Sequence, residues 1–247
     1  MSSLDFPGRT MAASLFSAAV SMSAGVASPY QLNPFGLDPL RMLLAQEVDF
    51  EALRADPPVR LLLAATRVND GRPRLFTENE VTIEMVLAST CLPLLQQAVE
   101  IDGTRYWDGG YSTNPPLRQL ALEGEARDIL LVKIMPEFLA RTPSRRADIV
   151  QRARQIAFNS SLWQELESLR ELQSLCREGG LRCAQRCRRL RDLQIHQVEA
   201  EQCVAGLQDE DPLNLDWRFL LRLKDHGRAA ATTWLAKDMP KRAVSVA

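Results

Sequence analysis

Residues 97–110 read QAVEIDGTRYWDGG, which predicts a tight β-hairpin. The two strands lie at residues 97–101 and 104–107, and the Asp102-Gly103 dipeptide between them is favoured in two-residue hairpin turns. The second strand leads to Asp108, which Gly109 and Gly110 follow directly. A carboxylate at a strand end is held on rigid structure, and the glycines allow a backbone or a substrate to come close. Asp108 is therefore a candidate base for a neighbouring hydroxyl, although Asp-Gly-Gly alone is more often only a turn.

The chain around this hairpin has the pattern of an α/β protein. Residues 31–136 alternate short apolar runs with Pro and Gly, as the core of such a fold does. Apolar runs indicate the strands, and capping residues indicate where helices begin. The predicted elements are a helix at 40–45 capped by Asp38 with Pro39 at its first position, a strand at 59–65, a turn at 69–71, a strand at 74–77, a helix at 81–89 capped by Thr77, and a strand at 129–134.

The two ends of the chain are predicted to be helical. Residues 1–30 are rich in Ala and Ser, and Met11–Ala27 is better explained as a short amphipathic helix than as a signal peptide. In the tail, residues 137–247, leucines recur at three- and four-residue spacing and predict one apolar helical stripe. These leucines are Leu162, Leu166, Leu169, Leu172 and Leu175. An arginine-rich helix follows Gly179-Gly180, and a last helix runs to about Leu235. The predicted domains are therefore residues 1–30, 31–136 and 137–247.

Composition narrows the possible partners. The chain has 247 residues, of which 46% are hydrophobic and 25% charged, so it is long and apolar enough to bury a core. The formal net charge of −1 provides no general attraction to nucleic acid, and no nucleic-acid partner is expected. No run of 18 apolar residues predicts a membrane span.

The cysteines do not predict a metal site or a disulfide framework. Five cysteines form an odd set, which suits a reducing cytoplasm better than a set of disulfides. Cys183 and Cys187 lie four residues apart on a predicted helix, where two metal ligands could face together. Only His196 and His226 could complete such a site, and no second cysteine pair at zinc spacing exists. Ordinary thiols are the favoured interpretation, so we expect neither a metal nor a cofactor, and we expect a cytoplasmic location.

Several motifs around Asp108 resemble those of patatin-like phospholipases, in the same order along the chain. These motifs are Ala88-Ser89 with Pro93, Asp108-Gly109-Gly110, and Asn114-Pro115. Residues 28–34, SPYQLNP, resemble one bacterial branch of the family, as does the tail around Asp216-Trp217 and residues 227–230. The resemblance covers roughly residues 28–236 and identifies the chain as similar to the carboxyl-terminal portion of this family.

The resemblance implies an α/β/α sandwich, incomplete in this chain and followed by a helical tail. It also implies a hydrolase of lipid metabolism, in which a serine attacks an ester carbonyl and an aspartate acts as the base without a histidine. By this resemblance Asp108 is the general base, and Gly109 and Gly110 shape its loop. The substrate is then a lipid or another ester, and no cofactor is implied.

Two other motifs of the family do not occur in this sequence. One is a glycine-rich loop that forms the oxyanion hole, and the other is G-x-S-x-G, the turn that exposes the nucleophile. Residues 21–25, SMSAG, come closest, but Ser23 follows a predicted helix instead of a buried strand, and Pro29 opposes a helix after it. Ser89 is interpreted as a helix-end residue and Ser112 as locally hydrogen-bonded. The dyad is therefore expected to lack its nucleophile, and this chain to be inactive alone.

Two hypotheses about function remain open at this point. In the first, the chain is the general-base half of an acyl hydrolase whose nucleophile lies elsewhere. In the second, it is a non-catalytic protein whose Arg- and Leu-rich tail binds a partner or contacts an anionic membrane surface peripherally. Packing of the tail on its own α/β body is favoured over the second hypothesis, because Glu165, Glu167 and Glu171 interleave with the leucines. Strands 59–65 and 129–134 are expected to have open edges or uncovered faces, which predicts self-association or marginal stability.

Overall fold

The computed structural model describes residues 27–36, 38–134, 137–139, 141–178, 184–199 and 216–237. The described chain divides into two units. The larger unit holds the described residues of 24–126 and 140–192, and the smaller unit holds those of 127–139 and 193–247. The helix predicted at Met11–Ala27 lies outside the described residues except for Ala27, and Ser23 and Cys183 lie outside them altogether.

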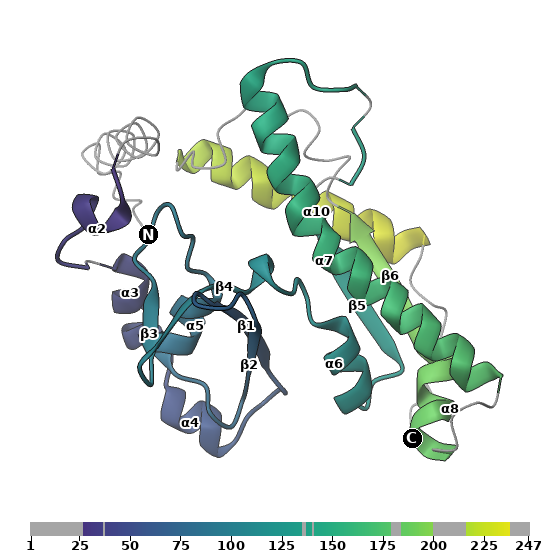
Figure 1. The fold of residues 1–247 in the computed structure, drawn as a ribbon. Coiled ribbons are helices and arrows are strands. Elements are labelled where there is room, and N and C mark those ends of the chain that lie inside the picture. Colours follow the sequence, from purple (N-terminus) through teal and green to yellow (C-terminus); the bar gives the residue numbers. More distant parts are fainter. Residues whose placement is uncertain are drawn as a thin grey trace, which may run out of the picture. The chain divides into compact units, whose positions relative to one another are not determined.

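The larger unit contains a four-stranded antiparallel sheet. Its strands are β1 (Leu62–Arg67), β2 (Pro73–Thr77), β3 (Val99–Ile101) and β4 (Thr104–Asp108), in the order β2-β1-β4-β3 (Figure 1). All four strands were predicted at nearly these positions. β1 pairs with a strand on each side, so the open edge expected for this strand is wrong. The sequence pattern predicts each strand separately and does not show which strands pair. Both partners of β1, β2 and β4, come from later in the chain.

β1 begins three residues later than predicted, at Leu62 instead of Val59. The apolar run does start at Val59, but that side chain is 60% exposed. The main-chain N–H of Leu61 donates to Glu78 Oε2 at 3.0 Å and thereby leaves the ladder. A buried carboxylate, which sequence pattern alone does not place, therefore sets the start of the strand.

The two hairpin turns follow from residues that tolerate positive φ. Asp102 has φ of 49° and Gly103 of 74°, the combination that a type I′ turn requires. Gly71, in the turn between β1 and β2, has φ of 69°. Both predicted turns are confirmed, because the left-handed region is open to Gly and to Asp at little cost.

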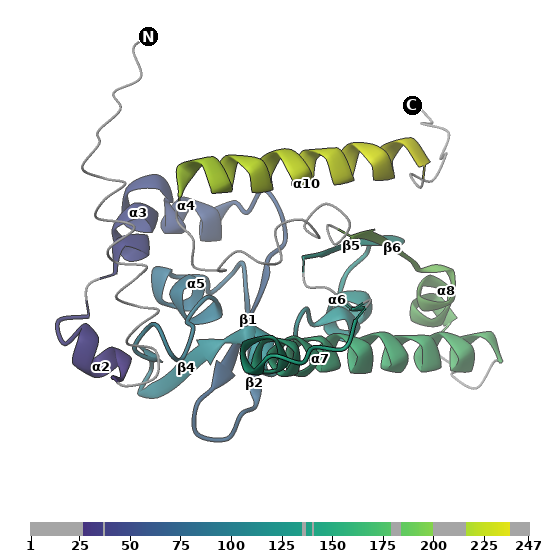
Figure 2. The same ribbon diagram turned by 90° about the horizontal axis from the view of Figure 1, so that it is seen from above.

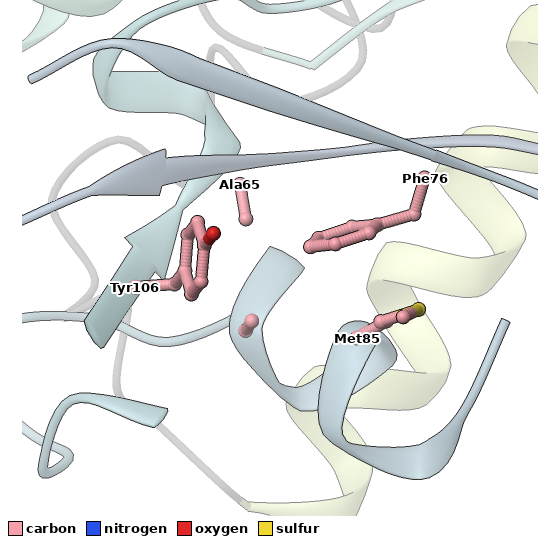
Figure 3. Packing of buried hydrophobic residues seen from close by; sticks show 5 residues of the cluster. Ala65, Phe76, Met85 and Tyr106 are labelled. Carbon is pink, nitrogen blue, oxygen red and sulfur yellow. The ribbon is translucent and has the colours of Figure 1, made fainter. Parts of the chain in front are cut away.

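Helix α5 (Ile83–Ser89) packs on the sheet and closes the core of the larger unit. Figure 3 shows Ala65 of β1, Phe76 of β2 and Tyr106 of β4 in one cluster with Met85 of α5, which lies beside Phe76. The Phe76 and Tyr106 rings meet edge to face with centroids 5.9 Å apart, an arrangement that aromatic pairs prefer. The sheet and the helix are therefore held by one apolar cluster.

The start of α5 was predicted too early and with the wrong cap. Thr82, not Thr77, caps the helix, because its side chain accepts from the N–H of Met85 at 3.4 Å. Thr77 ends β2, and its N–H donates to Glu80 Oε1 at 3.3 Å across a turn. The Thr77-x-x-Glu80 spacing indicated a helix start, but the strand pairing of Thr77 excludes it from the helix.

Between residue 27 and the sheet, the structure describes the helices α2 (Pro29–Leu32), α3 (Pro39–Glu47) and α4 (Phe50–Ala55). The predicted cap of α3 is confirmed, since Asp38 Oδ1 accepts from the N–H groups of Leu40 and Arg41. Asp49 caps α4 in the same way. Pro39 occupies the first turn, where its missing N–H leaves no helical hydrogen bond unmade.

Three further helices of the larger unit are α6 (Leu117–Glu123), α7 (Arg146–Arg177) and α8 (Ala184–Asp192). α7 contacts both of the others (Figures 1 and 2). The predicted leucine stripe lies on α7, where Leu162, Leu166 and Leu169 are buried and Leu175 is 47% exposed. Packing of this stripe within the chain is confirmed for the three buried leucines.

The smaller unit contains two parallel strands, β5 (Asp128–Lys133) and β6 (Gln194–Glu199), and the helix α10 (Trp217–Lys237), which Figure 2 shows along its length. β5 and α10 were predicted, but β6 lies in a segment predicted to be helical. That prediction is wrong because pairing with β5 decides the conformation of this short segment, and the β-branched Ile195 and Val198 suit it.

The two faces of β5 differ in burial. Ile129, Leu131 and Lys133 are buried, whereas Leu130, Val132 and Ile134 are 50%, 63% and 72% exposed. The uncovered face expected for this strand is therefore confirmed, and self-association through it stays a prediction. In the described residues, no helix is long and apolar enough to cross a membrane.

Glu78 makes the stability of the larger unit depend on pH. Hydrogen bonds from its own main-chain N–H and from Leu61 lower the pKa of this carboxyl, against the opposing effect of burial. Because the pKa is lowered in the folded state, the Glu78 carboxylate stabilises the protein at pH values above the ordinary pKa of glutamate. This stabilisation is lost as the pH falls from there through the lowered folded-state pKa. Between about pH 5 and about pH 3, Glu78→Gln is expected to flatten the fall of the unfolding free energy. Urea unfolding at a series of pH values measures this, and an unchanged slope would contradict it.

Candidate active site

Asp108 is the last residue of β4, and its main chain is held from two directions. Its N–H donates to the carbonyl of Cys91 at 2.8 Å, and its carbonyl accepts from Thr66 Oγ1 at 2.8 Å. Asp108 also pairs with Ala65 of β1 in the ladder. Three bonded neighbours therefore fix where the strand ends and where the side chain of Asp108 starts.

The carboxyl of Asp108 is half-buried, and one of its two oxygens accepts a hydrogen bond from the described residues. Oδ1 accepts from the N–H of Gly110 at 2.6 Å. No donor among the described residues reaches the other oxygen, Oδ2. Burial raises the pKa of Asp108 above its ordinary value, and the hydrogen bond from Gly110 partly opposes this. A carboxylate with a raised pKa is a better proton acceptor than an exposed aspartate.

Both glycines of the motif are required by close neighbours. Gly109 and Gly110 form a short 3₁₀ turn, η1 (Gly109–Tyr111), which follows Asp108. A Cβ on Gly109 would overlap the backbone carbonyl of Ala64 and lie 2.7 Å from its Cβ. A Cβ on Gly110 would lie 2.5 Å from Phe158 Cε1 and 3.0 Å from Asp108 Oδ1. The sequence predicted that another main-chain segment comes close to the glycines. This prediction is confirmed at Gly109, which lies against the main chain of Ala64 in β1.

Helix α7 packs against this loop, a contact between segments distant in the sequence. The rings of Tyr111 and Phe158 meet edge to face with centroids 5.0 Å apart. Glu165 Oε2 accepts from the N–H of Arg118 at 2.7 Å, at the start of α6, and Glu165 Oε1 accepts from Thr113 Oγ1 at 3.5 Å. Phe158 precedes Leu162 by four residues, so it continues the leucine stripe. That spacing was the available signal for its role.

The two serine hydroxyls nearest to Asp108 along the chain have other partners. Ser112 Oγ lies 2.8 Å from Thr66 Oγ1 and 3.4 Å from the carbonyl of Gly109. Ser89 Oγ donates to the carbonyl of Val86 at 2.7 Å, at the end of α5. The interpretations of Ser112 and Ser89 are confirmed. Within the described ranges, no hydroxyl hydrogen-bonds to the carboxyl of Asp108.

The cysteine beside Asp108 does not offer a nucleophile either. Cys91 is fully buried and its thiol donates to the carbonyl of Gln97 at 3.2 Å. Burial raises the pKa of Cys91 to about 11, so the thiol stays protonated and unreactive near neutral pH. In the part of the chain that the structure describes, no three His, Cys, Asp or Glu side chains group as metal ligands would.

The cavity of the larger unit lies away from the carboxyl of Asp108. It has a volume of about 450 Å³, and its lining includes Arg67, Arg74, Phe76 and Tyr106. Asp108 is not part of this lining. This cavity is therefore separate from the hydrogen bonds that orient the carboxyl of Asp108.

The sequence was also compared with known protein families. The family model described as patatin-like phospholipase matches residues 10–121. Residues 10–121 therefore belong to the patatin-like phospholipase family. The matched segment includes the whole four-stranded sheet and Asp108-Gly109-Gly110, and it ends within α6. No curated protein matches the chain. The patatin-like α/β fold class, with helices after the sheet, is confirmed.

The Thr66 hydroxyl connects β1 to the end of β4 and to the loop that follows it. Thr66 is 4% exposed. Thr66→Val would remove the hydroxyl that hydrogen-bonds to the carbonyl of Asp108 and to the hydroxyl of Ser112. Loss of a buried hydrogen bond at constant shape is expected to lower the unfolding free energy by about 1–2 kcal/mol. Thr66→Ser keeps the hydroxyl and is the control. Equal midpoints of urea unfolding for wild type and Thr66→Val would contradict the expectation.

Proposed function

We propose that this chain carries the general-base half of a patatin-like lipid acyl hydrolase. Asp108 would accept a proton from a serine hydroxyl that lies outside these 247 residues, in the same polypeptide or in a second one. The observation that carries the proposal is the carboxyl itself, which is half-buried and fixed by Gly110 through Oδ1, and whose Oδ2 receives no hydrogen bond from the described residues. The membership of residues 10–121 in the patatin-like family supports an ester of a lipid as the substrate class.

In the proposed reaction, the serine Oγ attacks the ester carbonyl while its proton passes to Asp108 Oδ2. When the tetrahedral intermediate collapses, the protonated Asp108 returns that proton to the leaving alcohol, and the acyl group stays on the serine. Water then attacks the acyl-serine, Asp108 takes a proton from it, and the proton returns to the serine as the fatty acid leaves. A base next to the nucleophile is what this type of covalent catalysis requires.

The surroundings of Asp108 support a nucleophile from elsewhere. The 247 residues contain no G-x-S-x-G motif. The two serines nearest to Asp108 along the chain, Ser89 and Ser112, are engaged with main-chain or hydroxyl partners. Ser23 lies outside the described residues, and it follows Ser21 where the motif has glycine. Without a serine in place, Asp108 has no proton to accept.

The test joins this chain to a second polypeptide that carries the glycine-rich loop and G-x-S-x-G of a patatin-like protein. We expect neither polypeptide alone to be labelled by a fluorophosphonate or to hydrolyse a p-nitrophenyl ester, and the mixture to do both. Turnover by the 247-residue chain alone, abolished by Asp108→Asn, would overturn the claim that the nucleophile lies elsewhere. Co-purification of the two polypeptides without labelling would count against Asp108 as the base.

The alternative, a tail that binds an anionic membrane, is less well supported. Arg189 of α8 donates to the carbonyl of Leu122 at 2.9 Å, and Arg191 pairs with Asp192 at 2.8 Å. These guanidinium groups already have partners within the chain, and the stripe leucines Leu162, Leu166 and Leu169 are buried. A cytoplasmic location with contact at a lipid surface remains part of the proposal.

A further inference from the structure

Two segments of the larger unit contain no charged residue. Residues 28–36 read SPYQLNPFG and include α2, and residues 89–99 read STCLPLLQQAV and connect α5 to β3.

The two segments are bound to each other although they lie about sixty residues apart. The N–H of Ala98 donates to the Tyr30 hydroxyl at 3.2 Å, and Gln97 Nε2 donates to the carbonyl of Asn33 at 2.5 Å. Within the second segment, the N–H of Leu92 donates to Gln96 Oε1 at 3.0 Å and closes a compact turn. The segments therefore form one surface of the larger unit.

This surface exposes large apolar side chains. We define the uncharged patch by its five members, whose exposed fractions are 48% for Tyr30, 50% for Leu32, 87% for Phe35, 37% for Leu92 and 54% for Leu94. Several large apolar side chains exposed together, with no charge among them, are the usual mark of a binding surface.

The patch begins beside the candidate base. The carbonyl of Cys91 accepts from the N–H of Asp108 at 2.8 Å, and Leu92 is the next residue along the chain. Leu92 and Leu94 are therefore carried by the segment that holds the main chain of Asp108. A molecule that rests on the patch therefore contacts the segment that holds the main chain of Asp108.

We propose that the uncharged patch binds the surface of a lipid aggregate with zwitterionic head groups. The inference rests on the proposed function, because such a surface would present the ester next to Asp108. Apolar side chains that enter the acyl boundary are removed from water, which favours binding. A patch without charge makes no ion pair with an anionic head group, so its binding is expected to be insensitive to salt.

The experiment measures flotation of the full chain with phosphatidylcholine vesicles. Phe35→Asp and Leu94→Asp place a charge in the patch, and each is expected to lower partitioning about tenfold or more. Val59→Asp is the matched control, since Val59 is 60% exposed in the same unit and lies outside the patch. The control is expected to bind as wild type does, and 1 M salt is expected to change neither result. All three positions are exposed, and thermal unfolding verifies that each variant is folded.

Several outcomes would overturn the proposal. They are the absence of binding to phosphatidylcholine vesicles, binding to anionic vesicles only, and an equal loss in Val59→Asp. A dimer that Phe35→Asp dissociates, seen by sedimentation with no vesicle binding, would assign the patch to a second copy of the chain instead. Asp108→Asn separates this proposal from the proposed function, because it should bind vesicles as wild type does. If the chain does not bind vesicles but the complemented enzyme still hydrolyses a soluble ester, the lipid-binding role of the patch is rejected and the proposed function is not.

Discussion

Asp108→Asn is expected to lower ester hydrolysis by the complemented enzyme by about 10²–10⁴-fold, the usual contribution of a general base. The amide keeps the shape of the carboxyl and its hydrogen bond from Gly110, but it cannot accept the proton at the Oδ2 position. The change should therefore lower the rate of hydrolysis without destabilising the fold. Initial rates on a p-nitrophenyl ester, taken with the folded fraction of each variant, measure this effect.

The pH profile provides a second reading of the same variant. Burial raises the pKa of Asp108, so wild-type activity should fall toward acid at a pH above the ordinary range of aspartate. Asp108→Asn should lose this acid limb together with most of the rate. Asp102→Asn is the matched control, because it makes the same chemical change in an exposed hairpin turn that tolerates asparagine. An equal loss in Asp102→Asn, or a full rate in Asp108→Asn, would refute Asp108 as the base.

Gly109→Ala is expected to lower the free energy of unfolding by about 3 kcal/mol, the upper end of the usual cost of overpacking. The new Cβ would overlap the carbonyl group of Ala64, which is main chain in the middle of β1. A strand paired on both sides cannot move aside without breaking its ladders, so the clash is not relieved by a side-chain rotation.

Two other glycines calibrate this prediction. Gly110→Ala should cost less than Gly109→Ala, because its main obstacle is the ring of Phe158, which can shift. Gly227 lies within α10 with no other atom within 4 Å of an added Cβ. Gly227→Ala should therefore be neutral or stabilise the protein by up to about 1 kcal/mol. Urea unfolding of the three variants gives the order, and a Gly109→Ala variant as stable as Gly227→Ala would disprove the close approach.

Much of the local structure was predictable from residues near one another in the chain. Asp102-Gly103 determines its hairpin turn through the positive φ that both residues accept. Asp38 with Pro39 determines the start of α3 through two hydrogen bonds from the first helical turn. The errors arose where a distant group intervened, as Glu78 does at Leu61 and as β5 does for β6.

The candidate site shows the same division. Asp108 and its glycines were identified from the hairpin, the glycine pair and the resemblance to patatin-like phospholipases. The residues that hold them were not, because Thr66, Cys91 and Glu165 reach the loop from β1, the end of α5 and α7. Phe158 illustrates the difficulty, since its spacing from Leu162 indicated only that it faces a core.

By itself, the sequence determined the four strands of the sheet, the two hairpin turns, the family and the identity of the candidate base. Each of these follows from contacts within a few residues or from a motif of adjacent residues. The tertiary structure alone decided that β1 lies between two partners, that residues 194–199 form a strand, and that α7 closes on the Asp108 loop. Those features depend on groups tens of residues apart, whose pairing is settled by backbone hydrogen bonds and burial in the folded chain.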